Sequence, residues 1–90
     1  MNKELVGWLV RSKKGRDSGK LYIVADVLDD FHVALMDGQK FNFTRRKRKN
    51  KKHLWILTKA DADVVQGIMS RDEKCLPNIF KLLELEAKEV

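Results

Sequence analysis

The chain has 90 residues, a formal net charge of +6 and a single cysteine, Cys75. This length gives one small domain with a modest core, which argues against a deep substrate pocket. The lone cysteine excludes an internal disulfide, no apolar run approaches the roughly 20 residues of a membrane span, and the N-terminus turns polar too early for a signal peptide, so we expect a cytoplasmic protein with a packed thiol.

The first two predicted strands flank a basic loop. Alternation over residues 6–12 predicts the first strand. Residues 13–19 are typical of a loop, because Gly15 and Gly19 allow positive φ. Residues 21–28 are nearly all apolar, which favours a central strand buried on both faces. Together these elements predict a β-hairpin.

Three further strands are predicted downstream. Residues 31–36 form the first, and Asp37-Gly38 is a two-residue hairpin turn into a strand over residues 39–44. Residues 53–58 form the last. Five short strands separated by turn signals predict a small, strongly bent sheet or barrel.

Strand parity separates the aromatic side chains into two groups. Phe31, Phe41 and Phe43 are expected in the core. Tyr22 and Trp55 have the opposite parity to their apolar neighbours, so we expect each to be half exposed. For these two, contact with the C-terminal helices and stacking on a nucleic-acid base both stay open.

The last third of the chain has helical spacing. Residues 58–70 carry apolar side chains at helical intervals, and Pro77 suits the first turn of a second helix over residues 77–88. We expect the helices to form a hairpin packed against the sheet. Residues 59–90 are then a helical appendage on the same unit as a barrel formed by residues 1–58.

The strongest charge signal is the basic run, residues 45–52. Residues 45–53 hold seven Lys or Arg and no acid, whereas residues 1–44 hold seven against six acids and residues 54–90 hold five against seven. Such crowding costs self-repulsion, which a polyphosphate backbone would relieve. We therefore expect an inserted loop with a mobile middle that binds RNA; a solvated loop and a nuclear localisation signal are the alternatives. The candidate binding residues are Arg45, Arg46, Lys47, Arg48, Lys49, Lys51 and Lys52.

The loop of the first hairpin adds four candidate binding residues, Lys13, Lys14, Arg16 and Lys20. Lysines offer point charges to phosphates, and Arg16 can form two parallel hydrogen bonds to a phosphate or stack on a base. In the alternative interpretation, Arg16 pairs with Asp17 or Asp26 and only shapes the turn.

Residues 7–24, GWLVRSKKGRDSGKLYIV, resemble the KOW motif of ribosomal proteins and NusG-type transcription factors. A glycine two residues before an apolar pair is followed by Ser-Lys, then by Gly-Arg-Asp-x-Gly-Lys and an apolar run. The resemblance implies an SH3-like five-stranded barrel, here mostly β with C-terminal helices, whose loop contacts RNA or protein. The order of barrel, basic stretch and helical tail is most similar to the fourteenth large-subunit ribosomal protein of archaea and eukaryotes and its short bacterial relatives. That similarity implies ribosomal RNA, and neighbouring ribosomal proteins, as partners.

These signals predict a non-catalytic RNA-binding protein, ribosomal or ribosome-associated, with no cofactor, metal, small-molecule substrate or membrane partner. His32 and His53 stand alone, no Cys/His spacing fits zinc, and no phosphate-binding glycine motif occurs. Two other functions stay open. One is a transcription or translation regulator whose barrel binds a protein through Trp8, Tyr22 or Trp55. The other is a nonspecific nucleic-acid binder that acts by charge alone.

Overall fold

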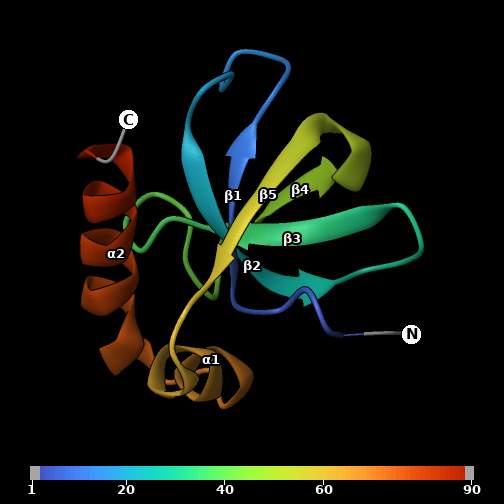
Figure 1. Cartoon of the computed structure of the whole chain (residues 1–90). Coiled ribbons are helices and arrows are strands. Elements are labelled where there is room, and N and C mark those ends of the chain that lie inside the picture. Colours follow the sequence, from blue (N-terminus) through green and yellow to red (C-terminus); the bar gives the residue numbers. More distant parts are fainter. Residues whose placement is uncertain (1–2, 89–90) are drawn as a thin grey trace.

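The structure, a computed structural model, describes residues 3–88 and consists of an antiparallel sheet followed by two helices (Figure 1). The strands are β1 (Trp8–Ser12), β2 (Leu21–Val27), β3 (His32–Met36), β4 (Lys47–Asn50) and β5 (Leu54–Lys59). The helices are α1 (Ala62–Met69) and α2 (Leu76–Lys88). Short 3-10 turns, Lys51–His53 and Glu73–Cys75, precede β5 and α2. The predicted class, mostly β with C-terminal helices, is confirmed.

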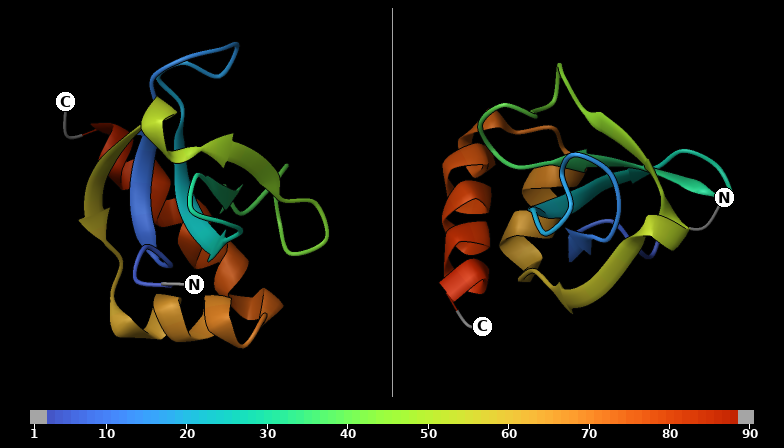
Figure 2. Two further views of the ribbon diagram at one scale, coloured as in Figure 1. Left: turned by 90° about the vertical axis from the view of Figure 1, so that its right-hand side faces the viewer. Right: turned by 90° about the horizontal axis from the view of Figure 1, so that it is seen from above.

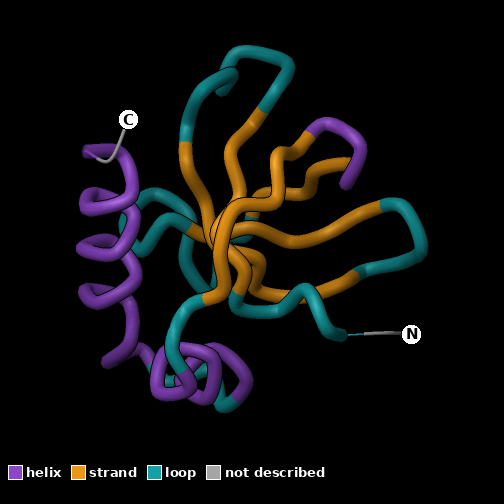
Figure 3. Tube along the Cα trace, in the orientation of Figure 1, coloured by secondary structure: helices purple, strands orange, loops and turns teal. Residues whose placement is uncertain are grey.

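The sheet is strongly curled. Its strand order is β4-β3-β2-β1-β5, so the two edge strands are consecutive in the chain. In a flat sheet these edges would lie roughly 19 Å apart, at about 4.8 Å per strand spacing. The Lys51–His53 turn that joins them advances only about 6 Å. The sheet must therefore bend until its edges approach, as Figures 2 and 3 show. Within residues 3–88, β4 and β5 do not pair, so the sheet stays open.

One continuous core joins the sheet to the helices. Ile23 of β2, Leu35 of β3 and Ile79 of α2 are fully buried in it. Cys75 belongs to the same core, and burial raises the pKa of its thiol, so the expected packed thiol is confirmed. Neither helix within residues 3–88 is long and apolar enough to cross a membrane.

The strand expected over residues 39–44 is wrong. These residues belong to a loop, residues 37–46, that runs toward α2 (Figure 1). The Asp37 carboxylate accepts hydrogen bonds from the backbone N–H groups of Gln39 and Phe41, both at 2.9 Å. Asn42 closes a second turn through its side chain. Local side-chain turns of this kind compete with strand pairing, and here they prevent it.

The fourth strand is instead the middle of the basic run. Lys47–Asn50 pairs antiparallel with β3, from Leu35 opposite Lys47 to His32 opposite Asn50. The expectation of an inserted loop at residues 45–52 is therefore corrected. A lysine- and arginine-rich edge strand is physically reasonable, because charge on an edge opposes pairing with another chain.

Three aromatic side chains depart from their expected burial. Phe41 is only partly buried and packs against the core. Phe31 is 66% exposed, because Asp29 accepts hydrogen bonds from the backbone N–H groups of Phe31 and His32 and holds Phe31 in the turn before β3. Tyr22 is only 3% exposed and packs edge-on against Phe41. Trp55, at 56% exposed, is confirmed as half exposed.

Gly38 fixes the position of the 37–46 loop against α2. Its φ is +85°, and a Cβ there would lie 2.5 Å from the Leu76 carbonyl oxygen and 2.9 Å from the Phe80 nitrogen. Because both neighbours are helix backbone, we expect Gly38→Ala to lower the free energy of unfolding by about 3 kcal/mol, measured by urea denaturation. Gly19→Ala is the matched control, since Gly19 has φ +88° and open space around it. That change should cost only about 1 kcal/mol of backbone strain. Equal losses in the two variants would refute the close contact at Gly38.

Candidate nucleic-acid interface

The loop between β1 and β2 is closed by its own backbone. Ser12 N–H donates to the Lys20 carbonyl at 2.9 Å, and Gly19 N–H donates back to the Ser12 carbonyl at 2.8 Å. Gly15 and Gly19 adopt the positive φ expected of them. Lys14, Arg16 and Lys20 are exposed on this ordered loop. The hairpin therefore presents its cations from a closed turn.

Asp17 anchors this loop to β4. Its side chain is 8% exposed, and its Oδ1 accepts hydrogen bonds from Ser12 Oγ and Lys49 Nζ, both at 2.8 Å. Lys47 Nζ lies 3.4 Å from Oδ2. Burial alone would raise the pKa of Asp17, but the hydrogen bonds from Lys49 and Ser12 and the two lysine charges outweigh it and hold the pKa well below its usual range. The Lys49 side chain is only 13% exposed, so its ammonium group serves to hold the hairpin loop through Asp17.

Strand alternation divides the basic run between two faces. Lys47 and Lys49 point toward Asp17. Arg46, just before β4, and Arg48, within β4, point to the opposite face of the strand. There Arg46 lies 3.7 Å from Asp26, and Arg48 lies 3.9 Å from Asp29. Part of the self-repulsion expected of the run is therefore relieved by aspartates within the fold.

Arg16 does not take the structural role considered for it. Asp17 is paired with the two β4 lysines, and Asp26 is paired with Lys3 and Arg46. Among residues 3–88, Arg16 forms no ion pair and stays exposed. Its guanidinium is available to a ligand.

Two segments far apart in the sequence meet at one end of the sheet. Lys49 Nζ donates to the Lys14 carbonyl at 2.8 Å, across 35 residues, and Lys13 N–H donates to the His53 carbonyl at 2.8 Å. We call the resulting surface the cationic face; it comprises Lys13, Lys14, Lys49, Lys52 and His53, with Trp55 beside them. Desolvation lowers the pKa of His53, and the charges of Lys14, Lys52, Lys49 and Lys13 lower it further. These four lysines thus lie close enough to His53 to disfavour a further positive charge there.

No family model and no curated protein in the comparisons matches the chain. The candidate interface accordingly rests on the chemistry of its own residues.

Trp55 gives the cationic face an aromatic surface. Its side chain projects from β5, and Lys13 Nζ lies 4.0 Å from the ring centroid. A cation at this distance is attracted by the face of the indole. Strand parity located this half-exposed tryptophan, but only the fold places it beside the hairpin lysines.

The other candidate residues lie elsewhere. Lys51 is partly buried and donates its backbone N–H to the Phe31 carbonyl. Arg16, Lys20 and Lys47 border a groove beside α2, and Arg45 lies 5.8 Å from the Phe41 ring that also lines it. The predicted residues are thus divided among the cationic face, the groove and the far side of β4. Within residues 3–88, no group of three His, Cys, Asp or Glu side chains could hold a metal ion.

Proposed function

We propose that the protein binds structured RNA through the cationic face, without catalysing a reaction. The observation that carries the proposal is the meeting of the hairpin loop with the end of the basic run, through the Lys49–Lys14 and Lys13–His53 hydrogen bonds. Such a concentration of lysines favours a polyanion, because phosphate contacts release condensed counterions.

The mechanism combines charge with stacking. Lys13, Lys14 and Lys52 supply point charges to phosphates, which position the RNA without reading its sequence. The exposed indole of Trp55 offers a surface for an unpaired base. Shape and backbone contacts would then dominate over base recognition.

The proposed family is that of KOW-type RNA-binding domains, within an SH3-like barrel. The curled sheet, the 3-10 turn between the edge strands, and the hairpin formed by the motif residues 7–24 support this proposal. Ribosomal RNA of the large subunit, with neighbouring ribosomal proteins, is the proposed setting, in the cytoplasm.

A protein-binding regulator is the second candidate. Phe31 and Ile56 are large apolar side chains exposed on the surface, in addition to Trp55. Tyr22 cannot contribute to such a contact, because it is buried. Trp8 is partly buried and could.

Sedimentation of a cell lysate through a sucrose gradient tests the proposal. We expect the protein to travel with the large ribosomal subunit at moderate salt, and a variant with Lys13, Lys14 and Lys52 of the cationic face changed to Gln to be released at lower salt. Binding to matched RNA and DNA duplexes provides the second measurement. Equal affinity for the two duplexes would favour a nonspecific binder, and protein at the top of the gradient in all salts would contradict ribosome residence.

A further inference from the structure

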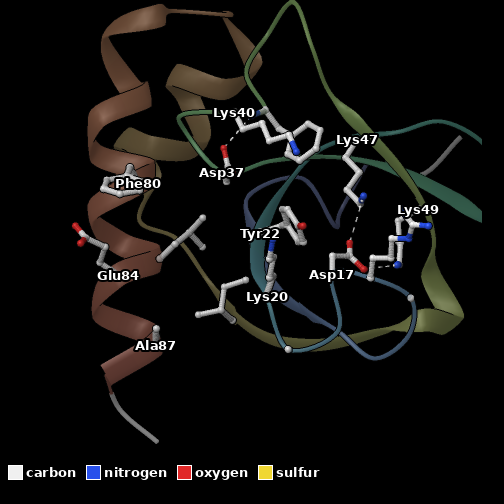
Figure 4. Close-up of a pocket in the computed structure, with 16 residues that line it drawn as sticks. Asp17, Lys20, Tyr22, Asp37, Lys40, Lys47, Lys49, Phe80, Glu84 and Ala87 are labelled. Carbon is white, nitrogen blue, oxygen red and sulfur yellow. Dashed lines mark hydrogen bonds and ion pairs between the residues drawn. The ribbon is translucent and has the colours of Figure 1, made fainter.

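A groove lies between α2 and the sheet, and it shares Lys49 with the cationic face. Its volume is about 750 Å³, within the range of small-molecule sites. Figure 4 shows its walls: Phe80 and Glu84 of α2 on one side, and Lys47 and Lys49 of β4 on the other, with Tyr22 between them. The hairpin loop and the 37–46 loop complete the lining.

Phe41 gives this groove an aromatic surface surrounded by cations. The ammonium groups of Lys47 and Lys40 lie 5.3 Å and 5.5 Å from its ring centroid, and the Arg45 guanidinium lies 5.8 Å away. The Tyr22 ring packs against it edge-on at 6.1 Å. An aromatic ring flanked by cations matches a nucleotide, whose base stacks while its phosphate pairs with charge.

The position of Phe41 is set before any ligand arrives. Its backbone N–H donates to the Asp37 carboxylate, and its carbonyl accepts from the N–H groups of Asp37 and Gly38. Gly38 in turn lies too close to α2 for any side chain. A preformed site loses less conformational entropy on binding, which favours affinity.

The lining is electrostatically suited to a phosphate. Five cationic residues line the groove against three acidic ones, and Asp17 engages Lys47 and Lys49. Arg16, Lys20 and Lys40 remain as exposed cations at the groove. These side chains can contact a phosphate without breaking the Asp17 anchor.

Asp17 borders the groove, but its carboxylate is held within the fold. Its Oδ2 accepts no hydrogen bond within residues 3–88, although Lys47 Nζ lies 3.4 Å away as an ion pair. Burial, together with the nearby charges of Asp17 and Asp37, raises the pKa of Tyr22 to about 12. A phosphate in the groove is therefore contacted by the exposed Lys20 and Lys40, and Lys47 stays paired with Asp17.

We infer that the groove receives one unpaired nucleotide of the bound RNA, with its base against Phe41 and its phosphate at Lys20 and Lys40. This inference rests on the proposed RNA-binding function and adds a preference for RNA that carries an extruded base. Adenosine is the appropriate probe, because a purine offers a large face for stacking on Phe41.

Three RNA hairpins of one sequence test the inference by fluorescence anisotropy at constant salt. The first is fully paired, the second carries a single bulged adenosine, and the third carries an abasic bulge. We expect the bulged adenosine to improve binding roughly tenfold over the other two, since one stacked base contributes on that scale. Phe41→Leu should abolish this gain and leave binding of the paired hairpin unchanged. Phe31→Leu is the matched control, at an exposed phenylalanine outside the groove lining, and should keep the gain.

Each contrary outcome is distinct. Equal affinity for the three hairpins would overturn the groove inference and leave RNA binding standing. No binding to any hairpin would overturn both. Saturable binding of free AMP, with no gain from the bulge, would assign the groove to a free nucleotide instead of RNA.

A second measurement avoids dependence on the folding of the Phe41 variant. A photoreactive 8-azidoadenosine at the bulge, crosslinked to the wild-type protein, should modify peptides that contain residues 15–22, 37–41 or 80–87. Crosslinks confined to other peptides would overturn the inference.

Discussion

Replacing Asp17 by asparagine is expected to lower the free energy of unfolding at pH 7 by about 3 kcal/mol, because it leaves a buried lysine without its counter-charge. The Asp17 side chain is 8% exposed and Lys49 is 13% exposed, so little water is available to solvate Lys49 Nζ in the variant. The same change weakens the attachment of the hairpin loop to β4, which Asp17 provides. Urea denaturation, followed by tryptophan fluorescence, measures the loss.

The pH dependence supplies a second signature. The pKa of Asp17 is lowered by folding, so its contribution is complete above the unfolded value of about 4 and is lost as the pH falls toward the lower folded value. The stability difference between the wild type and Asp17→Asn should therefore shrink below about pH 4. The folded-state pKa values of Asp26 and Asp29 are also lowered, but they act in both proteins and cancel in the comparison. Asp30→Asn, at an exposed position, is the control. If the stability difference between the wild type and Asp17→Asn did not change with pH, the proposed role of Asp17 as an anchor would be contradicted.

Local patterns in the sequence account for much of the sheet. The alternating and continuous apolar runs place β1, β2, β3 and β5 within two residues of their observed bounds. Asp61 accepts a hydrogen bond from Val64 N–H at 3.0 Å, so it caps α1 as well as favouring the helix dipole. The strand patterns depend on near neighbours, which is why the sequence alone predicts them.

The errors share a physical cause in competition between local and long-range contacts. Phe41 and Phe43 alternate with polar residues as a strand would, but the side chains of Asp37 and Asn42 turn the backbone instead. The partner of β3 is then the basic run, whose composition has no strand signal. This pairing depends on the register between β3 and β4. Register is a property of two strands together, so it cannot be predicted from the sequence of one of them.

The sequence predicts which kinds of residue form the candidate site, but it does not predict how the fold arranges them. The hairpin lysines and the basic run were identified by charge, yet Lys49 is largely buried on Asp17, 32 residues away. A pair separated so widely leaves no local signal in the sequence. The groove around Phe41 was missed altogether, since it requires the 37–46 loop, the hairpin and α2 to converge.

Removing four cations at and beside the cationic face should weaken RNA binding at least about 100-fold at low salt. The variant changes Lys13, Lys14 and Lys52 of that face, with Arg16 from the same hairpin loop, to Gln, and it spares Lys47 and Lys49 because these hold Asp17. Each lost phosphate contact means that fewer counterions are released on binding, so the magnitude of the slope of log K against log salt should fall by about 0.9 per contact if duplex RNA behaves as duplex DNA does.

A second variant separates local from global charge. Lys59, Lys74, Lys81 and Lys88 are exposed on β5, the turn before α2, and α2 itself, outside the cationic face and the groove lining. Changing these four to Gln removes the same net charge, so a binder that responds only to total charge would lose affinity equally in both variants. If the cationic face is the interface, the helix-side variant should keep its affinity within about threefold and retain most of its salt slope, because its lysines touch no phosphate.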